Sequence, residues 1–362
     1  MKKILVTGSS GYIGTVLVPY LENCGFECIG YDTGFFKDCF LYNEPQSKKI
    51  IWKDVRDITD DDLSGIDVVV HLSGISNDPL KKMDNSKVYD PVRLYSLMLA
   101  KKCKEKGVRF IFASSCSVYG IGSDEYLAET SPTNPQTGYS INKLQIEEDL
   151  KSISDKNFSP IALRFATAFG SSPRIRFDIV INMLTGMAFT ENRIILNSDG
   201  TAWRPNIHVL DFCEAIKRSI DLDYSDGELL ILNVGDDKNN LQVIEIAKII
   251  QEYNTGCEIK FLKENPELDD SGLVADRKVK GGGADTRNYK VSFEKIKKVF
   301  PGFECKWSVT SGVREMIEVF NKISLTSNMF KNRNFYRLQQ MEYLYENKFL
   351  SDEFRWIKSN EV

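Results

Sequence analysis

Histidine is scarce in this sequence, and paired cysteines and long apolar runs are missing from it. The 362 residues include two histidines, His71 and His208, so we expect neither a metal site nor a histidine-based nucleophilic triad. The eight cysteines are scattered without a CxxC pair, and no export signal precedes the first apolar run. We interpret them as reduced thiols of a cytoplasmic protein. No apolar stretch nears the ~18 residues that span a membrane, so no membrane contact is expected.

An excess of either charge is also missing. The chain carries 47 basic and 51 acidic residues, a net charge of −4, which gives no electrostatic reason to expect nucleic acid. Hydrophobic residues make up 42% and charged residues 27% of the chain, which is typical of a globular protein with a sizeable core. The length predicts one large α/β unit or two lobes.

Apolar runs alternate with helical periods over the first ~165 residues. Strand-like runs occupy 3–7, 26–31, 49–52, 67–72, 108–113 and 160–165, and helical patterns cover about 12–24 and 86–106. Runs this apolar, separated by helices, indicate strands buried on both faces. The pattern therefore predicts a doubly wound parallel sheet.

The pattern changes after Gly170. Residues 174–189 (RIRFDIVINMLTGMAF) are helical in character, whereas 229–234 (LLILNV) is again typical of a buried strand. We therefore expect the chain to leave the sheet, return to it and leave again. The polar stretch 264–288, which contains a triple glycine, predicts a mobile loop. The expected division is 1–167 plus about 205–236 for the cofactor domain, about 168–204 and 237–322 for a smaller mixed α/β substrate-binding lobe, and 323–362 for a peripheral helical tail.

The stretch VTGSSGYIG (6–14) joins the first strand to the first helix. Glycine lets the backbone turn sharply and approach a phosphate, and the helix N-terminus supplies free N–H groups. A glycine triplet at this junction predicts a dinucleotide site. The cofactor contacts expected from it are Gly8, Gly11, Tyr12, Ile13 and Gly14.

Acidic and small residues follow the next strands. Asp32 ends the second strand, where a carboxylate accepts the adenosine ribose hydroxyls and repels a 2′-phosphate, so the predicted cofactor is NAD. Asp54, followed by Val55, is placed to meet the adenine edge. After the fourth strand, the small residues let the cofactor lie over the sheet edge; the contacts expected there are Leu72, Ser73 and Gly74. His71 is interpreted as structural.

Two stretches carry candidate chemistry. ASSCSVYG (113–120) follows the fifth strand, and Tyr139 and Lys143 stand four residues apart at the start of a later helix, so their side chains share one face. Tyrosine is a weak base, with a pKa of about 10. A neighbouring ammonium group and the positive ring of NAD⁺ would lower that pKa. The pair suits proton removal from a sugar hydroxyl, and a serine from 113–120 would orient that hydroxyl.

At this point the chain resembles the extended short-chain dehydrogenase/reductase family, in its nucleotide-sugar epimerase/dehydratase branch with a Rossmann domain. The resemblance covers about residues 1–320 and rests on GSSGYIG, HLSG, SSCSVYG, YSINK, LRFATAFG, WRPNIHVLD and DTRNYKVS in this order. It implies that Ser115 acts with Tyr139 and Lys143. Tyr119 is then a packed ring, and Cys116 has no adjacent histidine to activate it as a nucleophile.

The resemblance also implies a nucleoside diphosphate sugar in the second lobe. The positions similar to the family's binding residues are Arg164, Thr167, Asn182, Arg204 and Arg287, although the family commonly has asparagine where this chain has Thr167. Ser117 is expected near the sugar. Of the two arginines in SPRIRFD, Arg174 and Arg176, one is expected to bind phosphate and the other to be solvated, and we take Arg174 as the candidate ligand. His208 is expected in packing or as a helix cap.

The predicted function is an NAD-dependent nucleotide-sugar epimerase that oxidises one carbinol, C4 in our interpretation, and reduces the ketone again on its other face. Family dehydratases carry Asp and Glu directly after the catalytic Ser/Thr, whereas this chain has Cys116 and Ser117. A dehydrogenase or keto-sugar reductase is the first alternative, and an NAD-binding regulatory protein without catalysis is the second. The family's usual pairing of two helices, here about 86–106 and from Ser140, implies a homodimer.

Overall fold

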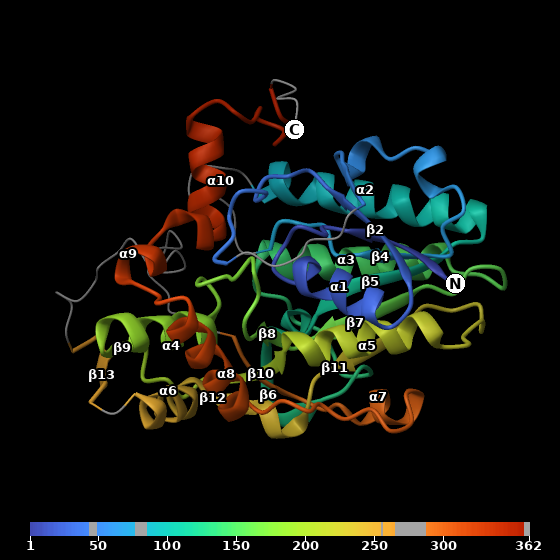
Figure 1. The fold of residues 1–362 in the computed structure, drawn as a ribbon. Coiled ribbons are helices and arrows are strands. Elements are labelled where there is room, and N and C mark those ends of the chain that lie inside the picture. Colours follow the sequence, from blue (N-terminus) through green and yellow to red (C-terminus); the bar gives the residue numbers. More distant parts are fainter. Residues whose placement is uncertain (43–48, 77–84, 255, 265–286, 358–362) are drawn as a thin grey trace.

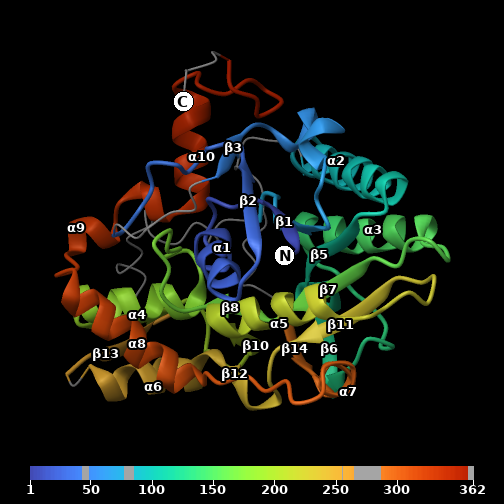
Figure 2. The same ribbon diagram turned by 45° about the vertical axis from the view of Figure 1, so that its right-hand side comes forward.

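A single parallel sheet organises the structure, a computed structural model that describes residues 1–42, 49–76, 85–254, 256–264 and 287–357. Its seven strands lie in the order β11-β7-β5-β4-β1-β2-β3 (Figures 1 and 2). Their bounds are β1 Lys3–Thr7, β2 Glu27–Asp32, β3 Ile50–Trp52, β4 Val68–His71, β5 Arg109–Ser115, β7 Ile161–Phe165 and β11 Leu230–Val234. Every pairing between neighbours is parallel. The predicted strand runs and the doubly wound fold are confirmed.

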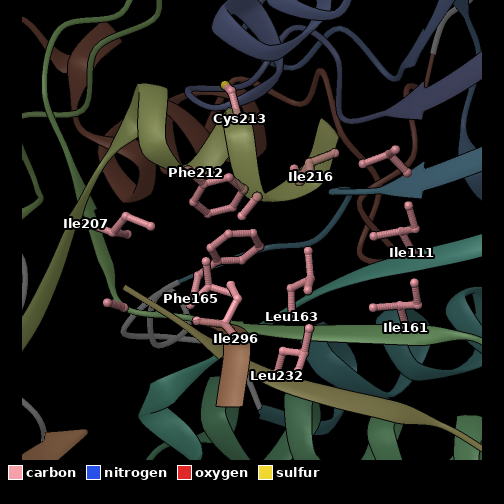
Figure 3. Close-up of a cluster of buried hydrophobic side chains, with 14 of the residues drawn as sticks. Ile111, Ile161, Leu163, Phe165, Ile207, Phe212, Cys213, Ile216, Leu232 and Ile296 are labelled. Atoms are coloured by element: carbon pink, nitrogen blue, oxygen red, sulfur yellow. The ribbon is translucent and has the colours of Figure 1, made fainter. Parts of the chain in front are cut away.

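Helices cover both faces of the sheet because its strands alternate their apolar side chains between two cores. In β1, Ile4 and Val6 belong to one core, and Leu5 belongs to the other. The first face is covered by α1 (Gly14–Asn23), α5 (Val209–Asp221) and α7 (Glu294–Val299), and the second by α2 (Asn85–Lys106) and α3 (Gly138–Ile153). Figure 3 shows Phe212 of α5 lying over Phe165 of β7, and their rings are stacked.

Smaller sheets and helices form a second core beside the large sheet. The strands of the smaller sheets are β6 Ile121–Leu127, β8 Thr167–Phe169, β9 Arg193–Leu196, β10 Trp203–His208, β12 Asn240–Gln242, β13 Glu258–Phe261 and β14 Asn288–Val291. The buried apolar side chains of β6, β10 and β14 belong to the first core, whereas β8, β9, β12 and β13 contribute to the second core. Its helices are α4 Val180–Glu191, α6 Val243–Tyr253 and α8 Val309–Lys322. The helix expected over 174–189 begins only at Val180. Residues before it form turns, because Arg176 and Asp178 pair with each other there instead of continuing a helical face.

The C-terminal residues are not peripheral, and this expectation was wrong. After α9 (Ser327–Phe330), the rings of Phe330 and Tyr336 are fully buried in the second core. The following α10 (Arg337–Glu346) and the chain up to Trp356 continue from α9 and pack against the beginning of α2 (Figure 1). The apolar side chains that make this contact are Leu338, Met341, Leu344, Leu350 and Phe354, which lie against Val88 and Tyr89.

Two further expectations concern parts of the chain outside the sheets. The loop expected at 264–288 lies, apart from its ends, outside the described residues. Among the helices in the described ranges, none combines the length and the apolarity that a membrane crossing requires.

Candidate functional site

A cavity of about 360 Å³ opens at the carboxyl ends of the central strands, where open α/β sheets bind ligands. It is lined by all of the predicted cofactor contacts and the three predicted catalytic residues: Gly8, Gly11, Tyr12, Ile13, Gly14, Asp32, Asp54, Val55, Leu72, Ser73, Gly74, Ser115, Tyr139 and Lys143. The sheet therefore brings together residues that are widely separated in sequence.

The glycine loop forms one wall of the cavity by close backbone contact. Gly8 has φ +73°, and a Cβ there would lie 3.0 Å from the backbone nitrogen of Ser73. A Cβ on Gly14 would lie 2.3 Å from the carbonyl oxygen of Gly8. Glycine is therefore required for the loop to fold against itself and the loop after β4. The N–H groups of Thr15 and Val16 in the first turn of α1 donate to the carbonyls of Gly11 and Ile13, so a phosphate in this cradle would face the glycine loop and the positive end of the helix dipole.

Asp32 stands at the end of β2 with its carboxylate held by the loop. Its side-chain oxygens accept the backbone N–H groups of Ser10 at 3.0 Å and Gly34 at 2.8 Å. Burial raises the pKa of Asp32 above its usual value, although these two bonds, Arg337 and Arg174 oppose the rise. The carboxylate retains lone pairs for ribose hydroxyls, and its negative charge would repel a 2′-phosphate. The residues present thus fit NAD.

Asp54 lines the same end of the cavity, but its carboxylate is already engaged. Arg56 donates to it from Nε at 3.0 Å and also from Nη2. The same carboxylate caps a short 3₁₀ turn by accepting the backbone N–H of Arg56 at 2.9 Å. Its contact with adenine stays a prediction.

The three candidate catalytic residues meet near the end of β5. Ser115 ends the strand and accepts the backbone N–H of Ser117 at 3.1 Å. Thr137 caps α3, which puts Tyr139 in its first turn and Lys143 one turn later. The ammonium of Lys143 donates to the carbonyl of Ala113 at 2.7 Å and lies 5.6 Å from the centre of the Tyr139 ring. The Ser115 hydroxyl acts on the hydroxyl of Tyr139 and lowers its pKa.

The pKa of Tyr139 is raised in the structure, whereas from the sequence we expected it to be lowered. Burial raises the pKa of Tyr139 above its usual value, and the opposing influences are the Ser115 hydroxyl and three arginines: Arg176, Arg337 and Arg287. Burial also lowers the pKa of Lys143 to about 7, with Arg337 adding to this effect and Glu147 opposing it. The chain alone therefore does not turn Tyr139 into an anion. The positive ring of bound NAD⁺ would lower the pKa of Tyr139 and favour its anion.

Three of the six predicted substrate contacts line the cavity: Ser117, Thr167 and Arg287. Ser117 is 5% exposed, and its hydroxyl has no hydrogen-bond partner among the described residues. A buried hydroxyl without a partner is costly, so this group is available to a ligand.

The other three predicted contacts lie outside the cavity wall. Arg174 is buried beside the ring of Phe36, at 4.4 Å from its centre. The side-chain amide of Asn182 is used within the fold, where it accepts from the backbone of Gly170 at 3.0 Å. Arg204 donates to the carbonyls of Trp203, at 2.8 Å, and Arg287. Arg164, which the resemblance also pointed to, is buried in an ion pair with Glu147.

The structure adds cavity residues that the sequence reasoning missed. Arg176, the arginine of SPRIRFD that we had not chosen as the candidate ligand, lines the cavity and bonds to the carboxylate of Asp178 and to the hydroxyl of Ser76 at 2.8 Å. The C-terminal segment also contributes to the wall, through Arg337, Met341, Glu353 and Phe354. The second arginine of SPRIRFD is the sequence signal that could have indicated a place for Arg176 in the cavity wall. The segment 337–354 carries no local motif that could have indicated its place.

Four further predictions are confirmed by burial and contacts. His71 is fully buried between the hydroxyls of Thr7 and Ser96, and burial and the Lys143 charge lower its pKa to about 3. His208 caps α5 and stacks on a tryptophan ring. The Tyr119 ring is fully buried. The Cys116 thiol donates to the backbone carbonyl of Arg164 and does not line the cavity, and burial raises its pKa, which disfavours the thiolate form.

Comparison with known proteins supports this geometry. The sequence model of a family described as "NAD dependent epimerase/dehydratase family" matches residues 4–235. The UDP-glucose 4-epimerase of Bacillus subtilis (strain 168) is 25% identical over 300 residues, covering 71% of this chain and 84% of the relative. That of Corynebacterium glutamicum is 27% identical over 277 residues and covers 71% of this chain and 83% of the relative.

Solved structures have the same fold. MoeE5 in complex with UDP-glucuronic acid and NAD is 25% identical, with a TM-score of 0.69, and the match covers 89% of this chain and 100% of MoeE5. The UDP-glucose 4-epimerase of Thermotoga maritima, solved with UDP-glucose, has a TM-score of 0.73 at 21% identity and the same coverage of both chains. The predicted α/β architecture is confirmed by these matches.

Proposed function

Since this chain belongs to the NAD-dependent epimerase/dehydratase family, and therefore uses NAD, we propose that it is a nucleotide-sugar epimerase. The observation that supports this most is the meeting of Ser115, Tyr139 and Lys143 in the cavity that also contains the glycine loop and Asp32. The relatives that are UDP-glucose 4-epimerases favour a UDP-sugar as substrate and C4 as the reacting carbon.

The three side chains divide the proton chemistry between them. Bound NAD⁺ supplies a hydride acceptor and, once reduced, a hydride donor. Tyr139 takes the proton of the sugar hydroxyl as the ketone forms and returns it when the ketone is reduced. Ser115, whose hydroxyl lowers the pKa of Tyr139, orients the same sugar hydroxyl. Lys143, fixed by the carbonyl of Ala113, holds the ring position of Tyr139 and adds positive charge when it is protonated.

The cavity wall favours epimerisation over loss of water. Elimination needs an acid and a base in addition to the hydride machinery. In the described parts of the chain, the carboxyl groups that line the cavity belong to Asp32, Asp54 and Glu353. Asp32 ends β2, three strands from Ser115 in the sheet order, which is roughly 14 Å at about 4.8 Å per strand. This wall offers the sugar no carboxyl group of the kind that elimination requires.

The nucleotide-sugar contacts form the second part of the proposal. We assign the sugar to the side of Ser117 and Thr167, because the unpartnered Ser117 hydroxyl faces the cavity beside the catalytic trio. Arg287 and Arg176 bring positive charge to this region and suit a diphosphate or an acidic sugar. Asn182, Arg174 and Arg204 support these elements from behind, through the contacts that they make within the fold.

One assay tests the reaction type. The protein is mixed with UDP-glucose or UDP-glucuronic acid in D₂O, without added cofactor. An epimerase should give a stereoisomer of equal mass with no solvent deuterium on carbon, because the hydride returns to the carbon that lost it. Deuterium on C5 with loss of water would show a dehydratase, and stoichiometric NADH would show a dehydrogenase. Bound nucleotide sugar that stays unchanged would indicate a regulatory protein.

We further propose a homodimer that forms through α2 and α3. These helices pack side by side, and Leu94 of α2 and Ile141 of α3 remain 67% and 43% exposed. A Leu94→Glu substitution should therefore convert a dimer into a monomer, whereas Arg314→Gln, an exposed change on α8, should not. Light scattering at micromolar concentration measures both. A monomeric unsubstituted protein would exclude the dimer.

The remaining assignments follow from the fold. We propose that 1–167 with about 205–236 binds NAD, that about 168–204 with 237–322 binds the nucleotide sugar, and that the protein works in carbohydrate biosynthesis. All eight cysteines are free thiols, which favours a reducing compartment, and we propose the cytoplasm. Limited proteolysis with and without NAD tests the division, since NAD should protect the first part preferentially.

A further inference from the structure

Arg337 brings a positive charge into the cofactor cavity from the C-terminal segment. It is the first residue of α10 and lines the cavity. Its guanidinium donates to the hydroxyl of Ser76, in the chain that follows β4, and its backbone nitrogen donates to Asp178 at 3.2 Å, just before α4. Arg337 is thus held from two sides, with its side chain bonded to the chain after β4 and its backbone bonded to the chain before α4.

The position of Arg337 is between the two ends of the cofactor site. Its charge acts on Asp32, where the adenosine ribose is expected, and on Tyr139 and Lys143, where the hydride chemistry is expected. In the sheet, β1 and its glycine loop separate β2 from β4 and β5. A dinucleotide that joins these two ends has its diphosphate in the middle, where the glycine loop lies.

The local charge balance favours an anion beside Arg337. The carboxylate of Asp178 is engaged by the guanidinium of Arg176, at 2.9 and 3.0 Å. The guanidinium of Arg337 bonds to a neutral hydroxyl, and burial together with Arg176 lowers the pKa of Arg337 to about 9. A diphosphate would stabilise the charge of this arginine and offer its fork parallel hydrogen bonds.

The chain that follows Arg337 reaches the adenosine end of the same cavity. Arg56 donates to the carbonyl oxygens of Glu353 at 2.7 Å and Phe354 at 3.0 Å. The indole nitrogen of Trp356 donates to the carbonyl of Thr33 at 2.7 Å, directly after Asp32. The segment therefore borders the site along its length, from the diphosphate region to the adenosine.

We propose that Arg337 is a ligand of the NAD diphosphate, and that residues 337–356 are an integral wall of the cofactor site. This inference rests on the binding of NAD and not on the proposed epimerase reaction. The test therefore measures binding, so that a failed epimerase assay would leave it intact.

Titration calorimetry on the full chain, stripped of nucleotide, provides the test. NAD, ADP-ribose, AMP and UDP are titrated into the unsubstituted protein and into Arg337→Gln. We expect the substitution to weaken NAD and ADP-ribose alike, by about 10- to 100-fold, because a hydrogen bond to a charged group is lost. Binding of AMP, which has no diphosphate, should change less than about twofold. Arg337→Lys should fall between the two proteins, since it keeps the charge but not the fork.

The control is Arg314→Gln, which removes an exposed arginine of α8 outside the cavity wall and should leave all affinities unchanged. An equal loss of AMP and NAD in Arg337→Gln would overturn the assignment, because it would mean that the whole segment had come away from the adenosine end. Weaker UDP with unchanged NAD would overturn it as well, by assigning the arginine to the diphosphate of the nucleotide sugar.

Discussion

Replacing Tyr139 with phenylalanine is expected to lower turnover by about 10²- to 10⁴-fold, the usual scale for removing a general acid–base group. The substitution keeps the ring, which packs near the C-terminal segment, and removes only the hydroxyl. The affinity for NAD should change little, because the glycine loop and Asp32 are untouched. Steady-state kinetics with a UDP-sugar and NAD titration together measure the two effects.

The matched comparison is Tyr119→Phe. Tyr119 lies in the turn after β5, but its hydroxyl donates to Asn233 at 2.8 Å inside the core. This variant should lose some stability and retain most of its turnover. A nearly active Tyr139→Phe combined with an inactive Tyr119→Phe would contradict the assignment of the base.

Replacing Glu147 with glutamine is expected to lower the free energy of unfolding by about 3–5 kcal/mol. Glu147 and Arg164 are 2% and 5% exposed and are joined by bonds of 3.0 and 2.6 Å. Burial alone would lower the pKa of Arg164, but the carboxylate of Glu147 holds it above its usual value. Without that carboxylate, a buried guanidinium loses its counter-charge. Urea unfolding, monitored by circular dichroism, measures the change in the free energy of unfolding.

The neighbouring Glu148 provides the control, because its side chain is exposed and Glu148→Gln should cost no more than about 0.5 kcal/mol. A double variant, Arg164→Met with Glu147→Leu, should be more stable than Glu147→Gln, since apolar residues can replace a buried pair. A loss below about 1 kcal/mol in Glu147→Gln would show that Arg164 does not depend on this partner.

The sheet and its glycine loop were predictable because their causes are local. A strand buried on both faces appears in the sequence as an apolar run, as in 67–72. The apolar run at 108–113 predicted the strand that ends at Ser115. The spacing of Tyr139 and Lys143 follows from helix geometry alone. Each of these signals lies within a few residues of the position that it predicts.

Local sequence signals could not predict which arginines line the cavity. Arg174 and Arg176 differ by two residues in a segment without regular structure, so periodicity could not tell which one lines the cavity. The role of 337–356 depends on contacts with residues almost as distant as the chain allows; Arg56 and Glu353 are 297 positions apart. The segment is also rich in polar and aromatic residues, a composition that suits a surface tail equally well.

The position of α10 in the chain has a consequence for the order in which the protein is made. Translation produces the glycine loop first and Arg337 only after both cores, so the nascent chain presents Gly8 and Asp32 long before the wall that faces them exists. The cofactor cavity is therefore completed late in synthesis. With the role that we propose for residues 337–356, a chain interrupted before residue 337 would lack this wall of the cofactor site.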